Sequence, residues 1–145
     1  MPTFDYTFTV AAPVDAVAGF HDDTRALQRL TPGYVHIRRS DPMAEGAIAE
    51  FTVWLGPIPI RWRALHRDVG PNGFTDIQDE GPMKSWVHTH RFEAISDSAT
   101  RVHEHIEYEY GPGWDGVRGR LFFSPLALRA LFAYRSWLTR RALRG

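Results

Sequence analysis

The chain has 145 residues, of which 43% are hydrophobic and 23% are charged, and its formal net charge is zero. These proportions are typical of a globular protein, and the length predicts one domain spanning residues 1–145. A neutral balance argues against a nucleic-acid binder, because neutralising phosphates requires a basic excess. The chain contains no cysteine, so disulfides and thiol chemistry are excluded.

The hydropathy pattern indicates neither a membrane span nor a secretory leader. No apolar run approaches the roughly 18 residues that a membrane helix needs. The opening residues, MPTFDYTFTV, alternate and include Asp5, where a leader would have a basic stretch and an apolar block. We therefore expect a cytoplasmic protein without stable membrane insertion, present as a monomer or a homodimer.

The first part of the chain predicts a strand, two short helices and a second strand. Residues 4–10 alternate apolar and polar side chains, which is typical of a half-buried strand. Pro13 suits the first turn of a helix, and a second helix is expected over Thr24–Leu30. Alternation resumes over residues 34–39.

The middle of the chain predicts consecutive strands joined by short turns. One hairpin is expected over residues 47–67 around Gly56-Pro57, and another over residues 74–95 around Gly81-Pro82. A last strand follows at residues 100–110. Strands connected in this way form an antiparallel meander.

The C-terminal part predicts a loop and then a long helix. The glycine-rich stretch GPGWDGVRG, residues 111–119, is expected to be a loop, either a lid over the cavity entrance or a flexible connector to the last helix. Ser124-Pro125 predicts the start of a helix that reaches about residue 143, with Leu128, Leu131 and Leu138 on one stripe. A curved antiparallel sheet holds such a helix in its concave face. We thus predict an α+β fold in which six or seven strands wrap around this helix and leave a cavity.

The hairpin over residues 74–95 carries polar side chains among aromatic ones on a single face. If the turn pairs residues 79 and 85, Asp76 lies opposite His88 and Phe74 lies opposite His90. This face is too polar for an ordinary core and too aromatic for an ordinary exterior. We interpret it as the wall of a pocket.

Glu104, on the next strand, reaches the same patch as Asp76, His88 and His90. Buried carboxylates need partners, and imidazoles supply them. In an enzyme these four residues would be the catalytic acid–base set. The structural alternative, which we favour, is that pairs Asp76–His88 and His90–Glu104 fix the register of the strands.

Two histidines and a carboxylate are also the ligand set of zinc or non-haem iron sites. Aromatic crowding, and the lack of a further histidine on this face, argue against a metal here. We therefore predict no metal ion and no other cofactor.

Several segments resemble a known family. PIPIRWRALHRDV, FTDIQDEGPMKSWVHTHRFE, TRVHEHIEYEYGPG and LFAYR are similar to bacterial cyclase/dehydrase-like members of the START/SRPBCC superfamily, which includes StAR-related lipid-transfer and polyketide cyclase/dehydrase proteins. The resemblance covers nearly the whole chain and implies the helix-grip fold, with a deep cavity for a hydrophobic small molecule. Glu104 stands where an aspartate is commoner in the family. Because relatives include carriers, aromatic cyclases and regulators, the resemblance implies no single chemistry.

Aromatic and apolar side chains are expected to line the cavity, with Trp54 and Trp62 facing each other across their hairpin. Arg135 falls on the apolar stripe of the last helix, and we expect it to pair with a buried acid, Glu104 first, because an unpaired buried charge is costly. The alternatives are that its guanidinium reaches the rim of the cavity or contacts an anionic group of the ligand. The predicted ligand-binding residues are Trp54, Trp62, Phe74, Trp86, His88, His90, Tyr108, Tyr110, Phe122, Leu131, Tyr134 and Arg135.

The sequence therefore predicts a protein that binds a hydrophobic or aromatic small molecule, lipid- or polyketide-like, as a carrier or sensor. The alternative is a polyketide cyclase or dehydratase that uses the histidine–carboxylate cluster. A third hypothesis is an interaction module whose groove holds a segment of a partner protein.

Overall fold

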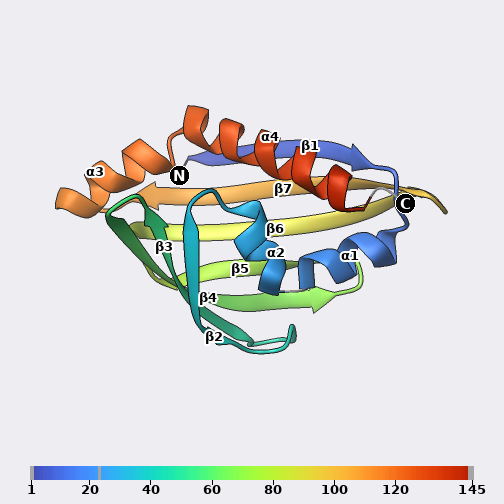
Figure 1. Ribbon diagram of the computed structural model, residues 1–145, viewed down its shortest axis with the longest axis horizontal. Helices are drawn as coiled ribbons and strands as arrows, with labels where there is room; N and C mark the ends of the chain where they lie inside the picture. Colours follow the sequence, from blue (N-terminus) through green and yellow to red (C-terminus); the bar gives the residue numbers. More distant parts are fainter. Residues whose placement is uncertain (1, 23, 144–145) are drawn as a thin grey trace.

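The computed structural model describes residues 2–22 and 24–143, and these residues form one seven-stranded sheet with four helices (Figure 1). The strands are β1 (Thr3–Val10), β2 (Tyr34–Ser40), β3 (Ile48–Leu55), β4 (Ile58–Gly70), β5 (Gly73–Glu80), β6 (Met83–Ser96) and β7 (Ala99–Tyr110). The helices are α1 (Val14–Asp22), α2 (Thr24–Leu30), α3 (Gly113–Phe122) and α4 (Pro125–Ala142).

The sheet is an antiparallel meander with one added strand. Its order is β1-β7-β6-β5-β4-β3-β2, so β2 to β7 follow one another and β1 pairs with β7 at the far edge. Helix α4 packs along β1 and touches α2, while α1 packs on β6 and β7 (Figure 1). The predicted α+β fold, with a curved sheet around a C-terminal helix, is confirmed.

Helix α4 begins where the sequence predicts. The Ser124 hydroxyl accepts a hydrogen bond from the Ala127 amide at 3.2 Å, which caps the first turn. Its buried stripe differs in detail: Leu128 and Phe132 are buried together with two hydroxyl residues, Ser136 and Thr139. Both hydroxyls bond carbonyls of their own helix, so their burial leaves no unpaired donor.

Two groups of buried apolar side chains flank the middle of the concave face. One is built around Trp62, Trp86 and Phe132. The other is built around Phe8 and Phe92, next to α1. These two groups anchor the helices at both ends of the sheet and leave space between them.

The predicted loop over residues 111–119 is wrong, because most of this stretch belongs to α3. Its glycines allow close packing. A Cβ on Gly116 would lie 2.2 Å from the Gly111 carbonyl oxygen. One on Gly119 would lie 3.0 Å from the Tyr110 ring and 3.2 Å from the Met83 sulfur. Composition suggested flexibility, but the contacts show a helix that lies against β6 and β7.

The expectation that Trp54 and Trp62 face each other is also wrong. The tight turn pairs Leu55 with Ile58, so Trp54 lies opposite Pro59 and Trp62 lies opposite Phe51. Residues that share a face on two such strands therefore have one odd and one even number. The two tryptophans are both even-numbered and point to opposite faces of the sheet.

None of the helices in the described ranges is long and apolar enough to cross a membrane.

The packing of α3 gives a first testable prediction. Gly116→Ala should lower the free energy of unfolding by about 1–3 kcal/mol, because the added methyl group meets a backbone oxygen and forces a shift. Gly19→Ala in α1 is the matched control: nothing lies within 4 Å of its Cβ. The control should stabilise by about 0.5–1 kcal/mol through helix propensity. Urea denaturation of both variants measures this difference, and equal midpoints would contradict the assigned packing.

Candidate functional site: a histidine–carboxylate cluster on a cavity wall

A cavity of about 620 Å³ lies between the concave face of the sheet and the helices. This volume is within the range of small-molecule sites, about 300–1,000 Å³. Its wall includes most of the residues that the sequence singled out, namely Trp62, Phe74, Asp76, Trp86, His88, His90, Glu104, Phe122, Leu131, Tyr134 and Arg135.

Three predicted ligand-binding residues do not line the cavity. Trp54 is 39% exposed, on the other face of β3. Tyr108 is buried in the core beside Trp86, with ring centroids 6.5 Å apart. Tyr110 donates its hydroxyl hydrogen to the Phe123 carbonyl at 2.9 Å, so it ties β7 to the junction of α3 and α4. Contrary to the prediction, Trp54 is therefore a surface residue, and Tyr108 and Tyr110 have structural roles.

The polar cluster comes from three neighbouring strands. Asp76 lies on β5, His88 and His90 on β6, and Glu104 on β7. The pairing of Asp76 with His88 and of Phe74 with His90 is the register that the turn predicted. Glu104 is opposite His90. All four polar side chains therefore point from the concave face into the cavity.

The hydrogen bonds within the cluster run diagonally. His88 Nε2 lies 2.5 Å from Glu104 Oε2, and His90 Nε2 lies 2.7 Å from Asp76 Oδ2. The directly opposed pairs make weaker contacts: His90 Nδ1 is 2.9 Å from Glu104 Oε2 without hydrogen-bond geometry, and His88 Nδ1 is 3.8 Å from Asp76 Oδ2. The predicted pairs Asp76–His88 and His90–Glu104 are therefore present as ion pairs, while the hydrogen bonds join the diagonal neighbours. Diagonal neighbours on a sheet lie within reach of long side chains, and an imidazole is long enough to use them.

Aromatic rings enclose the two imidazoles. The His88 and His90 rings lie 3.8 Å apart between centroids. Phe74 stacks on His90 at 4.2 Å, and Phe132 of α4 meets the His88 ring edge-on at 5.4 Å. His88, His90 and Glu104 are all less than 10% exposed. The cluster is therefore held in an apolar setting where its charges interact strongly.

Burial and the neighbouring charges separate the two histidines. Burial acts to lower the pKa of His90, but Glu104 and Asp76 outweigh it and raise that pKa to about 10. Burial lowers the pKa of His88, and the charge of His90 adds to this effect. For Glu104, burial acts upward, yet the two histidines hold the pKa well below its usual value. The metal-free cluster therefore contains two carboxylates, one imidazolium and one neutral imidazole.

The predicted ion pair between Arg135 and Glu104 is wrong. Arg135 lines the cavity, but its Nε donates to the Leu30 carbonyl at 3.0 Å and its Nη2 donates to the Thr31 hydroxyl at 3.3 Å. The last carbonyls of a helix lack partners within that helix, so the end of α2 offers acceptors to the guanidinium. The carboxylate of Glu104 is already occupied by the two histidines.

Two histidines on the cavity wall were missed by the sequence argument. His66 on β4 lies opposite Asp76 and bonds the Ala47 carbonyl at 3.0 Å. The alternation through Ile60, Trp62 and Ala64 already indicates that it points inward. His21 of α1 contacts the Val17 carbonyl at 2.8 Å, and its ring lies 6.3 Å from that of His90. Its spacing of four from buried Val17 is the signal that would have found it.

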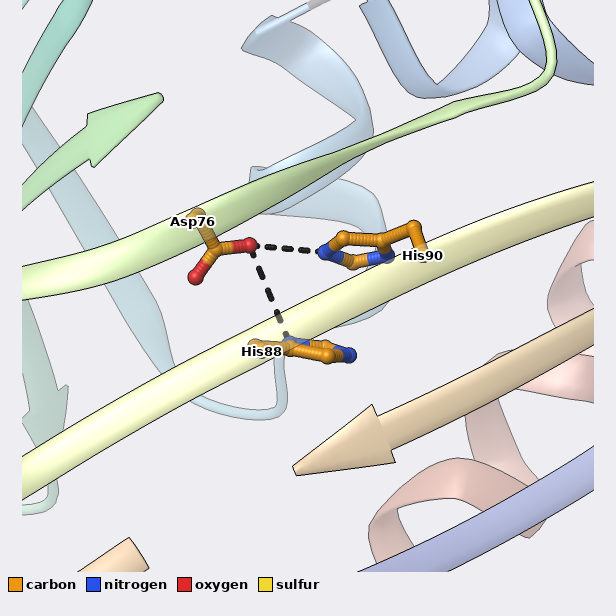
Figure 2. Close-up of side chains that lie close together, drawn as sticks. All are labelled: Asp76, His88 and His90. Atoms are coloured by element: carbon orange, nitrogen blue, oxygen red, sulfur yellow. Dashed lines mark hydrogen bonds and ion pairs between the residues drawn. The ribbon is translucent and has the colours of Figure 1, made fainter. Parts of the chain in front are cut away.

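One set of side chains in the described part of the chain has metal-binding geometry. Ligand atoms of Asp76, His88 and His90 all lie within 4.8 Å of one another (Figure 2). The arrangement therefore supports proton transfer, ligand binding or metal coordination at one place on the wall.

Removal of one buried charge tests whether the cluster acts as a unit. Glu104→Gln should lower the free energy of unfolding by about 3–5 kcal/mol, because it breaks a buried ionic pairing on one side only. Glu107→Gln on the exposed face of the same strand is the control, and its effect should stay within about 0.5 kcal/mol. Urea denaturation compares the two variants. If both unfold at the parent's midpoint, Glu104 does not hold the histidines together.

No protein-family model and no curated protein matches the sequence. Solved structures match over nearly the whole chain. A START superfamily protein from Mycobacterium smegmatis is 9% identical, with 98% of this chain and 97% of that chain covered and a TM-score of 0.74.

Two further matches are enzymes. The Zhui aromatase/cyclase from a Streptomyces species is 18% identical, with 98% and 90% of the two chains covered and a TM-score of 0.68. Norcoclaurine synthase from Thalictrum flavum, in complex with dopamine and hydroxybenzaldehyde, is 15% identical, with 97% and 85% covered and a TM-score of 0.68. At these identities the comparison concerns the fold alone. The chain has the helix-grip fold, which it shares with proteins of the START superfamily.

Proposed function

We propose that the protein binds a hydrophobic or aromatic small molecule in the cavity and acts as a carrier or sensor. The observation that carries this proposal is a cavity of about 620 Å³ whose wall is largely aromatic and aliphatic but contains one charged cluster. Apolar walls supply affinity, and a few placed polar groups supply orientation.

The wall favours a particular shape and polarity of ligand. Trp62, Trp86 and Phe74 present ring surfaces from three neighbouring strands, and Leu131 closes the opposite side from α4. A flat, largely apolar body fits between these surfaces. A hydroxyl or carbonyl group on that body would meet the histidine–carboxylate cluster. We therefore propose an aromatic or polyketide-like molecule with one or two oxygen substituents.

The fold neighbours agree with this class of ligand. One solved neighbour holds dopamine and hydroxybenzaldehyde, which are aromatic rings with oxygen substituents, and another is described as an aromatase/cyclase. Both likenesses are at the level of the fold, so they support the proposal only by analogy.

Filling the cavity should abolish binding without changing the fold. Ala64 is buried on the cavity wall, and Ala64→Phe places a ring in the ligand's space. Titration with the apolar dye phenylnaphthylamine, followed by fluorescence, should show binding weakened about tenfold or more, which corresponds to about 1.4 kcal/mol of lost contact.

The matched control is Ala94→Phe, an exposed position on β6 outside the cavity, which should bind the dye like the parent. Circular dichroism confirms that both variants are folded. Unchanged dye affinity in a folded Ala64→Phe variant would contradict a ligand site in this cavity.

The alternative function, a cyclase or dehydratase, has one specific observation in its favour. The two histidines are adjacent, yet one has its pKa raised to about 10 and the other has its pKa lowered. Paired groups whose pKa values are pushed apart are a common acid–base arrangement. In this hypothesis His88 accepts a proton from the substrate, and the charge of the adjacent His90 imidazolium stabilises a developing oxyanion.

The masses of the bound molecules separate a carrier from a dehydratase. Molecules that co-purify with the parent and with His88→Ala are extracted and weighed by mass spectrometry, with exposed His103→Ala as the control. A dehydratase should hold product in the parent and a species heavier by one water molecule in His88→Ala. A carrier should hold the same molecule in all three proteins.

A further inference from the structure

We propose that Asp76, His88 and His90 form a binding site for a divalent transition-metal ion on the cavity wall, with Glu104 orienting both histidines. The proposal is independent of the ligand proposed above, since it concerns only side chains of this chain.

The three ligand atoms converge at metal-binding distances. Asp76 Oδ2 lies 2.7 Å from His90 Nε2 and 3.8 Å from His88 Nδ1, and Figure 2 shows this oxygen directed at a nitrogen of each ring. Two ligands of a tetrahedral ion, each about 2.0–2.1 Å from the metal, are about 3.3 Å apart. The two observed separations bracket that value. The third separation, between the two ring nitrogens, is no more than 4.8 Å, so rotations of the side chains can bring all three atoms around one ion.

The remaining nitrogens of both imidazoles contact the same carboxylate oxygen. His88 Nε2 is 2.5 Å and His90 Nδ1 is 2.9 Å from Glu104 Oε2. Histidines that bind metals usually place their second ring nitrogen against a carboxylate, which fixes the tautomer and the ring orientation. Glu104 makes this hydrogen bond with His88, and the same oxygen lies beside the second ring nitrogen of His90. Each histidine thus has one nitrogen on Glu104 and the other on the side of Asp76.

The cluster also places two lone pairs next to each other with no hydrogen atom between them, and a cation can bind both. If His88 donates its Nε2 hydrogen to Glu104, its Nδ1 has a lone pair, and the nearest cluster oxygen, on Asp76, also has only lone pairs. A metal ion between these atoms satisfies both.

The sequence argument against a metal depended on aromatic crowding and on the lack of another histidine. In the structure the Phe74 ring stacks on the face of His90, where it leaves the in-plane nitrogens free to coordinate. His66 and His21 both lie on the same cavity wall. Neither premise therefore counts against the site.

Three protein ligands leave coordination positions open. Sites of this kind keep a position for water or substrate, and two imidazoles with one carboxylate suit zinc, iron, cobalt and nickel. Because Asp76, His88 and His90 all line the cavity, an open position would face the bound molecule. The ion would then bind an oxygen donor, such as a carbonyl or enolate, of a ligand in the cavity.

The test is metal binding by the full chain after treatment with a chelator. Zn²⁺ binding is measured by calorimetry, and Co²⁺ binding by its visible ligand-field absorption. The expected result is one ion per chain. Asp76→Asn, which removes a ligand oxygen, should weaken binding at least about tenfold, and Glu104→Gln should weaken it by about 10–100-fold.

The chain provides a matched control on its outer face. His103 and His105 of β7 both contact Asp5 of β1, at 3.0 Å and 2.7 Å, so they repeat the residue types at an exposed position. The double variant His103→Ala/His105→Ala should bind the ion like the parent. The proposal is overturned if this variant loses the ion while Asp76→Asn keeps it, or if the parent binds neither Zn²⁺ nor Co²⁺.

A second measurement uses the parent protein alone, in case a cluster variant does not fold. X-ray absorption of the Co²⁺ or Zn²⁺ form should show two imidazole ligands. Paramagnetic Co²⁺ should shift the ring resonances of His88 and His90, leaving those of His103 and His105 unmoved. Shifts confined to the outer pair would overturn the proposal. Dye binding by the metal-free protein reports on the cavity separately, so the two proposals succeed or fail independently.

Discussion

The buried contacts between Glu104 and the two histidines determine most of this structure. The carboxylate lies on β7 and the imidazoles on β6, and Asp76 extends the cluster to β5. A shift of one residue in either pairing would move these groups to opposite faces and leave buried charges unpaired. The cluster therefore specifies the register of three strands. It also makes the concave face polar at its centre, on the wall of the cavity.

The helices close the cavity from its other side, and Arg135 connects two of them. Its bonds to Leu30 and Thr31 join the middle of α4 to the end of α2. Its guanidinium also lies 5.4 Å from the Phe132 ring centroid, the ring that meets His88. The stabilising contacts of α4 are thus at the cavity's rim and at its two apolar ends. This distribution leaves the centre open for a ligand.

Stability and function would use the same residues in this protein. A cluster of four ionisable groups in an apolar face costs desolvation, and an apolar replacement of similar volume is often as stable. Residues that are arranged this way in a cavity are candidates for function on physical grounds. A carrier would use the cluster to orient a ligand, a dehydratase would use it to move protons, and a metal site would use it to hold an ion. All three uses depend on the same convergence of side chains.

Local patterns in the sequence determined which faces meet. The alternation in residues 74–95 and the Gly81-Pro82 turn were sufficient to place Asp76 opposite His88, and Ser124-Pro125 was sufficient to start α4. These are periodic or short-range signals, so they depend on few residues. The alternation of Ile60, Trp62 and Ala64 likewise indicates that His66, on β4, points inward.

Other features depended on which elements pack together, and only the tertiary structure decided them. The glycines of α3 suggested a loop from composition alone. Their close contacts with Gly111, Tyr110 and Met83 explain the helix, and no local pattern in the sequence reveals those contacts. The partner of Arg135 depended on how close the end of α2 lies to α4. The diagonal hydrogen bonds of His88 and His90 depended on side-chain reach beyond the register. Periodicity specifies the direction of a side chain, whereas its partner is determined by distances between elements that are far apart in the chain.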